Sequence, residues 1–288
     1  MTAGPGTGIA LALSTSSCYP EPTAACFAFA SRLGYDGVEV MVYTDPVSQD
    51  VAALRQLVEH YGVPVLAVHV PCLLVTQRVW GTDGWGKLVR SVDLAEELGA
   101  GVVVVHPPFV WQRAYARGFV EGLARLQTRT AVLIAVENMY PWRAGRAELP
   151  AYAPGWDPTP QAYPYVTLDL SHTAASGSDP LAMMVDLGPR LRHVHLADGS
   201  GAPRDEHLVP GRGTQHADLV LSRLVATGWS GTVVVEVNTR RSSGRPTREP
   251  DLAESLAFAR QHLAQAPPPT AVAVHPRTGR HGLMSPDA

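Results

Sequence analysis

Six apolar runs of this chain each end in a side chain that can bind a metal ion. Three runs end in an imidazole and three in a carboxylate, and successive ends lie roughly 25–40 residues apart, the spacing of βα units. Three carboxylates and three imidazoles gathered in one place are costly to bury unless a divalent cation pairs with them. The runs are Val65–His69, Val102–His106, Val132–Glu137, Tyr165–Asp169, Arg192–His195 and Thr232–Glu236.

The elements that would position these residues are strands alternating with helices. Parallel strands that are buried on both faces read as nearly continuous apolar stretches. Between the second and third of these stretches, Asp50 and Gly62 are the residue types that begin and end a helix, and Leu252–Leu263 after Pro250 predicts a closing helix. We expect strands over Ile9–Ser14, Gly37–Val42, Val63–Val70, Gly101–His106, Ala131–Glu137, Tyr165–Asp169, Leu191–Leu196 and Thr232–Val237.

Eight β/α alternations predict an α/β fold, a single (β/α)8 TIM barrel over residues 8–265. Residues 266–288 begin with Ala-Pro-Pro-Pro and have no apolar periodicity, so we expect a disordered C-terminal tail. In such a barrel the C-terminal ends of all strands open onto one face. Ligand-type residues that are distant in the sequence therefore converge there.

The composition suits a globular protein without a membrane segment. Of the 288 residues, 45% are hydrophobic and 17% are charged, an ordinary balance, and the net charge of −3 gives no overall basic field for nucleic acid. Cys18, Cys26 and Cys72 are an odd number at no zinc-ribbon spacing, which favours reduced thiols. The apolar stretch Ile9–Leu13 is too short for a membrane span. We expect a cytoplasmic protein with no membrane partner.

Three further ligand-type residues, His172, Asp205 and His207, lie where they can join the strand ends. A single imidazole such as His69 is as often a hydrogen-bonded rim residue as a metal ligand. Carboxylates that end successive strands, however, repel one another unless a cation lies between them. The combined pattern therefore predicts a divalent-metal site.

Five short motifs resemble those of the xylose-isomerase-like TIM barrels. That superfamily includes sugar and sugar-phosphate isomerases and epimerases, inositol-catabolism enzymes and AP endonuclease family 2, the endonuclease IV group. The resemblance covers most of the chain and is specific for the superfamily, not for a reaction. The motifs are Glu137-Asn138, Asp169-Leu-Ser-His172, His193-Val-His195-Leu-Ala-Asp198, His207-Leu-Val-Pro-Gly211-Arg-Gly213 and Val235-Glu236.

The resemblance implies two alternative metal sites. The epimerase branch implies one Mn²⁺, Co²⁺ or Mg²⁺ held by Glu137, Asp169, His195 and Glu236. The endonuclease branch implies three Zn²⁺ ions. The nine residues that match its ligands are His69, His106, Glu137, Asp169, His172, His195, Asp205, His207 and Glu236.

Our first interpretation is an isomerase or epimerase that acts on a sugar, cyclitol or sugar phosphate. A cation that polarises a substrate carbonyl acidifies the adjacent C–H. Glu137 and Glu236 are then expected to exchange that proton through a metal-stabilised enediolate, with their roles divided by their surroundings. His172 is expected to orient a substrate hydroxyl.

The alternative is a zinc-dependent phosphodiesterase or apurinic-site endonuclease. An enzyme that works inside a duplex needs a wedge for the base stack and basic surface for the phosphates. The endonuclease group usually has a tyrosine where this chain has Cys72, so nucleic acid is the less favoured partner. A thiol nucleophile at Cys72 is weaker still, because His69 is expected on metal. A non-catalytic metal-binding protein would not need both Glu137 and Glu236.

Three connections at the same barrel face are expected to contact the substrate. Asn138–Pro164 is long and rich in proline and aromatics, which suits a lid or a packed surface excursion. Asp198–Thr214 is glycine-rich, and backbone N–H groups of such loops often bind phosphate. Arginines after the last strand indicate an anionic substrate if they point inward and a solvated face if they do not. The residues expected to take part are Trp142, Arg143, Gly211, Gly213, Arg240 and Arg241.

Overall fold

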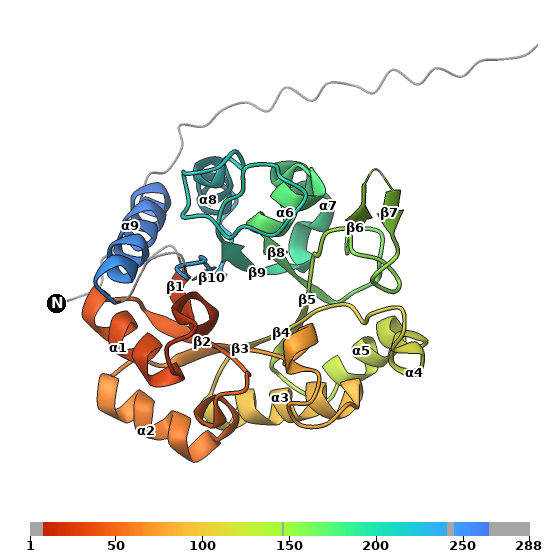
Figure 1. Ribbon diagram of the computed structural model, residues 1–288, viewed down its shortest axis with the longest axis horizontal. Helices are drawn as coiled ribbons and strands as arrows, with labels where there is room; N and C mark the ends of the chain where they lie inside the picture. Colours follow the sequence, from red (N-terminus) through yellow and green to blue (C-terminus); the bar gives the residue numbers. More distant parts are fainter. Residues whose placement is uncertain (1–7, 146, 241–244, 265–288) are drawn as a thin grey trace, which may run out of the picture.

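Eight parallel strands close into a barrel that helices surround (Figure 1). This architecture confirms the predicted TIM barrel. The computed structural model describes residues 8–145, 147–240 and 245–264, so the predicted tail at 266–288 lies outside the described residues. The barrel strands are β1 (Ile9–Ser14), β2 (Gly37–Met41), β3 (Val65–His69), β4 (Val102–Val105), β5 (Leu133–Glu137), β8 (Tyr165–Asp169), β9 (Leu191–Leu196) and β10 (Gly231–Val235).

The strands follow one another around the barrel in chain order, and β10 closes it against β1. β5 pairs directly with β8 because the two intervening strands lie outside the barrel. Nearly every strand residue is buried, and β2 and β4 are buried throughout. Burial on both faces is the reason that these segments read as continuous apolar runs in the sequence.

The helices that cover the barrel begin and end at the residue types expected from the sequence. Asp50 accepts a hydrogen bond from the N–H of Ala53, and Gly62 ends the same helix with a φ of 67°. The α-helices are α1 (Thr23–Leu33), α2 (Val51–Tyr61), α3 (Gly84–Leu98), α4 (Arg113–Ala116), α5 (Phe119–Gln127), α6 (Leu170–Ser176), α7 (Pro180–Leu187), α8 (Ala217–Ala226) and α9 (Arg245–Ala264).

The closing helix corrects one prediction: α9 begins at Arg245 instead of after Pro250. Pro250 removes a single backbone donor, and contacts around it stabilise the added turns. Glu249 pairs with Arg32 at 2.7 Å, and Tyr35 donates its hydroxyl to the carbonyl of Leu252 at 2.7 Å. The prediction was wrong because these partners come from α1 and the loop that follows it, about 215 residues earlier.

The long connection after β5 contains an antiparallel hairpin that the sequence analysis missed. It consists of β6 (Trp142–Ala144) and β7 (Ala147–Leu149), and it stands at the edge of the molecule, outside the ring of barrel strands (Figure 1). A separate apolar cluster underlies it, built from Phe109, Met139 and Tyr152 with Trp142 packed against them. Across the described residues, the helices include none with the length and apolar character needed to cross a membrane.

Candidate metal centre

Four strand ends bring Glu137, Asp169, His195 and Glu236 together, and we call these residues the carboxylate centre. Each residue offers one ligand atom, and these atoms lie within 4.8 Å of one another. Nδ1 of His195 lies 2.8 Å from Glu236 Oε2, 3.2 Å from Glu137 Oε1 and 3.5 Å from Asp169 Oδ2. All four side chains are buried. Three carboxylates and one imidazole so close together form a donor set that fits a divalent cation.

Asp169 is held in place by its backbone and by one of its two carboxylate oxygens. Its N–H donates to the side-chain oxygen of Asn138 at 2.7 Å, and Asn138 returns a bond to its carbonyl at 3.1 Å. Oδ1 caps α6 by accepting the N–H of His172 at 2.7 Å. Oδ2 is buried without a hydrogen-bond partner. A bare, buried carboxylate oxygen of this kind is what a metal ligand requires.

Glu39 lies on the far side of His195, and the sequence analysis missed it. Its Oε1 is 3.2 Å from Nε2 of His195, and its Oε2 is 2.8 Å from Nε2 of His193. All three side chains are fully buried. Burial opposes ionisation of Glu39, but the positive charge of His195 and the hydrogen bonds hold its pKa below the ordinary value. The carboxylate therefore orients His195 so that Nδ1 faces the carboxylate centre.

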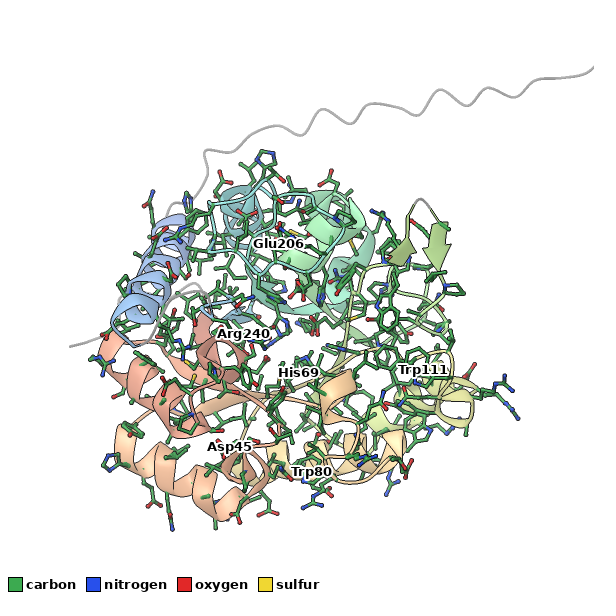
Figure 2. The ribbon with its side chains drawn as sticks, viewed as in Figure 1. Asp45, His69, Trp80, Trp111, Glu206 and Arg240 are labelled. Atoms are coloured by element: carbon green, nitrogen blue, oxygen red, sulfur yellow. The ribbon has the colours of Figure 1, made fainter. Side chains whose placement is uncertain are left out.

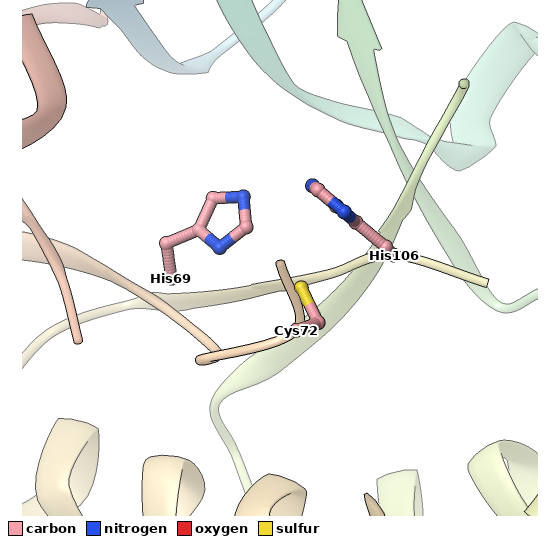
Figure 3. Close-up of side chains that lie close together, drawn as sticks. All are labelled: His69, Cys72 and His106. Carbon is pink, nitrogen blue, oxygen red and sulfur yellow. The ribbon is translucent and has the colours of Figure 1, made fainter. Parts of the chain in front are cut away.

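A second group, His69, Cys72 and His106, lies beside the carboxylate centre, and we call it the thiol cluster (Figure 3). Its ligand atoms also lie within 4.8 Å of one another. Glu137 Oε2 is 3.1 Å from Nε2 of His69 and 3.0 Å from Nε2 of His106. Burial opposes ionisation of the thiol, but the charge of His106 and hydrogen bonds to both imidazoles lower the pKa of Cys72 to about 6.

The third group combines Asp169 with His172 and His207. Asp205 joins them, since its Oδ2 lies 3.4 Å from Nε2 of His172 and 2.9 Å from Nε2 of His207. The hydroxyl of Ser171 donates to the other oxygen of Asp205 at 2.6 Å. Burial opposes protonation of His207, but the carboxylate of Asp205 raises the pKa of the imidazole to about 10.

Residues from all three groups line one cavity of about 840 Å³ at the C-terminal face of the barrel. Figure 2 shows His69 near the middle of this face and Arg240 to its upper left, and both line the cavity. Asp169 and His195 are fully buried and do not line it. The seven other residues predicted as metal ligands line the cavity: His69, His106, Glu137, His172, Asp205, His207 and Glu236.

The walls of the cavity are aromatic, and its carboxylates are balanced mainly by imidazoles instead of by lysine or arginine. Of the described residues that line it, Arg240 is the only lysine or arginine, and its guanidinium lies 4.4 Å from the ring centre of Tyr19. Glu21 and Asp45 add negative charge near the entrance. The aromatic lining residues are Tyr19, Tyr43, Phe109, Tyr140, Trp142 and Tyr152.

The predicted substrate-binding residues have different positions. Trp142 and Arg240 line the cavity, whereas Arg143 is exposed and does not, and Arg241 lies outside the described residues. The N–H groups of Gly211 and Gly213 donate to the buried carboxylate of Asp198 at 2.9 and 3.0 Å. Their amides are thus occupied by an anion that the chain itself supplies. Asp198 also accepts the N–H groups of Gly199 and Gln215.

A parallel barrel with imidazoles and carboxylates at its C-terminal mouth defines a class of metal-site TIM barrels. Residues 27–262 match the xylose isomerase-like TIM barrel family, and the chain belongs to that family. The uncharacterized protein Rv0498 of Mycobacterium tuberculosis is 51% identical over 274 residues, which cover 88% of this chain and 98% of the relative. Fructoselysine 3-epimerase of Escherichia coli O157:H7 is 22% identical over 76% of this chain and 86% of its own length.

Solved structures with the same fold include epimerases and an endonuclease. The 3-keto-D-glucoside 4-epimerase YcjR of E. coli matches with a TM-score of 0.64 and 17% identity, covering 88% of this chain and 99% of that one. Endonuclease IV of Thermus thermophilus matches with a TM-score of 0.56 and 20% identity, covering 88% and 99%. The IOLI protein, solved with a bound zinc atom, matches with a TM-score of 0.62 and 17% identity, covering 88% and 98%.

Proposed function

We propose that this protein is a divalent-metal-dependent isomerase or epimerase of a sugar, cyclitol or sugar phosphate. The observation that carries the proposal is the carboxylate centre at the floor of an aromatic-walled cavity. A cavity of about 840 Å³ accommodates a small polyhydroxy substrate. The similarity to fructoselysine 3-epimerase and to YcjR supports the reaction class.

Glu137, Asp169, His195 and Glu236 would hold the cation. Three carboxylates and one imidazole suit Mn²⁺, Co²⁺, Mg²⁺ or Zn²⁺. Such a cation, when bound, polarises a substrate carbonyl and so acidifies the neighbouring C–H.

Glu137 and Glu236 carry the proton in this proposal. Burial opposes their ionisation, but the charge of His195 outweighs it, lowering the pKa of Glu236 to about 2 and holding that of Glu137 well below its ordinary value. Both are therefore carboxylates at neutral pH in the metal-free protein, and a bound cation would replace the charge of His195 in keeping them ionised and able to accept a proton. One removes the proton from the substrate carbon, and the other delivers a solvent-derived proton.

Ser16 and His172 position the reacting groups. The hydroxyl of Ser16 donates to Oε1 of Glu236 at 2.6 Å, which leaves Oε2 toward His195. Nδ1 of His172 lies 2.8 Å from the carbonyl of Asn138, so the ring is held with Nε2 on the side of Asp205. From there His172 orients a substrate hydroxyl.

The test is solvent exchange in deuterium oxide. The protein, supplied with Mn²⁺ or Co²⁺, is incubated with a panel of ketoses, their phosphates and inosose-type cyclitols, and NMR follows deuterium at the carbon next to the carbonyl. We expect incorporation that Glu236→Gln abolishes and that Glu97→Gln, a change at an exposed surface pair with Arg55, leaves intact. Substrate turnover without any incorporated deuterium contradicts the proton transfer.

A zinc-dependent phosphodiesterase is the second candidate, because all nine residues that match endonuclease IV ligands line one cavity or lie next to residues that line it. Arg240 is the only lysine or arginine among the described residues that line the cavity, which argues against a DNA backbone as substrate, because such a substrate needs basic surface. Metal stoichiometry separates the two candidates. Three tightly held zinc ions together with nicking of a duplex that contains an abasic site support hydrolysis, and an active protein with one Mn²⁺ or Co²⁺ and no nicking supports the epimerase.

A further inference from the structure

The thiol cluster is a built site that the proposed proton transfer does not use. His69 comes from the end of β3, Cys72 from the loop that follows it, and His106 from the end of the neighbouring β4. Figure 3 shows the sulfur of Cys72 pointing toward the gap between the two rings. We propose that Cys72 adds a thiolate ligand to the two imidazoles, so that the cluster binds zinc or a similarly thiophilic cation through its sulfur.

The donor set suits zinc. Two imidazoles and a thiolate are common zinc ligands, and the ligand atoms of one zinc ion lie at most about 4 Å apart. Here the three ligand atoms lie within 4.8 Å of one another before any ion draws them in. The rings of His69 and His106 meet edge to face, with centroids 4.9 Å apart. A water molecule can complete the coordination of an ion that these three residues hold.

The loop that carries Cys72 is held rigidly, as a preformed ligand requires. The buried ammonium of Lys87 donates to the carbonyls of Pro71, Thr76 and Gln77 at 3.2, 3.0 and 2.8 Å. The N–H of Cys72 donates to the carbonyl of Val70 at 2.7 Å. Lys87 thus ties both ends of the segment from Pro71 to Gln77 to α3. The thiol stays beside the imidazoles without needing an ion to order the loop.

Two cavities give access to the cluster. His69 and His106 line the main cavity, and Cys72 and His106 line a second one of about 220 Å³ that Trp111 and Tyr115 also border. An ion can therefore reach the imidazoles from the mouth of the barrel. The sulfur remains open to small reagents from the second cavity.

The thiol cluster and the carboxylate centre differ in the ions they favour. Thiolate selects Zn²⁺ and other soft cations, whereas an oxygen-rich site also suits Mg²⁺ and Mn²⁺. Glu137 contacts both groups, with Oε2 toward the thiol cluster and Oε1 toward His195. The proposed site stands whether the carboxylate centre serves an epimerase or a hydrolase.

Cobalt spectroscopy tests the assignment directly. The full-length protein is stripped of metal under reducing conditions and titrated with Co²⁺, and a near-ultraviolet sulfur-to-cobalt charge-transfer band reports a thiolate ligand. We expect the band in the wild type and its loss in Cys72→Ser. It should persist in Cys26→Ala, which removes a buried thiol elsewhere, and in Glu236→Gln, which impairs only the carboxylate centre.

A second measurement needs no variant. Added Zn²⁺ should slow alkylation of Cys72 in the wild type at least about tenfold, as read by peptide mass spectrometry, because a coordinated thiolate is shielded from the reagent. The proposal is overturned if the wild type shows no charge-transfer band, if the band survives in Cys72→Ser, or if Zn²⁺ leaves alkylation unchanged. Loss of the band in Glu236→Gln would show that the thiol cluster is not a separate site. An absence of epimerase activity affects none of these readouts.

Discussion

Replacement of Glu39 by glutamine tests how the barrel interior positions the carboxylate centre. β2 and β9 are separated in the barrel by β1 and β10, so Glu39 reaches across the interior to His193 and His195. Glutamine keeps the shape of the side chain and removes its charge. It leaves Glu137 and the other residues of the carboxylate centre unchanged.

The size of the effect follows from these contacts. The amide oxygen can accept from one imidazole only, so one hydrogen bond to a charged group is lost, which costs about 1.5–3 kcal/mol. For a chain of this size that lowers Tm by roughly 3–10 °C. His195 also loses the carboxylate that orients it, and loss of such a partner weakens metal binding about 10- to 100-fold. The expected result is a folded protein with impaired metal affinity.

The pH dependence has a definite sign. The pKa of Glu39 in the folded protein lies below its ordinary value of 4.5. Its stabilising contribution is therefore complete above pH 4.5 and declines as the pH falls below that value. The stability difference between the wild type and Glu39→Gln should shrink over the same acidic interval.

Chelator competition with Mn²⁺ or Zn²⁺ and thermal unfolding at several pH values are the assays. Glu97→Gln is the control, because Glu97 forms an exposed ion pair with Arg55 at 3.4 Å and should change neither quantity measurably. If Glu39→Gln folds and binds metal as tightly as the wild type, Glu39 does not position His195.

Three other predictions rest on contacts in the same barrel face. Asp198→Asn should lower the free energy of unfolding by about 3–6 kcal/mol, because two of its four N–H partners lose a charged acceptor; an unchanged denaturation midpoint contradicts this. Arg240→Ala should raise the KM for a sugar phosphate about tenfold and leave the KM for the free sugar nearly unchanged, because only the phosphate needs the guanidinium. Equal effects on the two substrates argue against an anion contact. In the metal-free protein burial opposes protonation of His106, but Cys72 and Glu137 raise its pKa to about 9. Zinc affinity should therefore rise with pH up to about 9 and then level off, and calorimetry in two buffers should measure the released proton. An affinity that is independent of pH between 6 and 9 refutes this.

The ends of the strands could be predicted because each apolar run stops at a residue that does not belong in a core. Glu137 and Asp169 are the last residues of β5 and β8, and Glu236 follows directly after β10. Topology supplies the rest, since parallel strands in a closed barrel all end on one face. No information beyond the runs and their spacing is needed to bring these residues together.

Neither Glu39 nor the place of Cys72 between two imidazoles could be found in this way. Glu39 lies in the middle of β2 between two valines, so the sequence reads as a strand whose side chains alternate between apolar and polar faces. Nothing in the sequence identifies its partner His193 on β9. Cys72 lies three residues after His69, but its second neighbour, His106, comes from another strand. Both depend on contacts between elements that are distant along the chain, and only the closed barrel defines these contacts.

The glycine-rich loop shows a different limit. Its composition indicates that backbone N–H groups will bind an anion, and they do, but the anion is the carboxylate of Asp198. The hydrogen bonds from Gly211 and Gly213 to Asp198 therefore have a structural role. They close the loop between these residues, which carries Asp205 and His207 to the cavity. A sequence pattern can indicate the kind of contact without indicating whether the partner is a substrate or the chain.

The buried charges at the mouth explain why the same side chains can serve folding and chemistry. Without a cation, imidazoles must keep their protons to balance the carboxylates, which is why the pKa of His207 is raised to about 10 and that of His195 well above its ordinary value. A cation that binds the carboxylates replaces this positive charge and releases protons. The metal binding that we propose would therefore exchange charge within a preformed cluster, with little need for the barrel to rearrange. The carboxylates are Glu39, Glu137, Asp169, Asp205 and Glu236, and the imidazoles are His69, His106, His172, His195 and His207. His193 is not among them, because burial lowers its pKa.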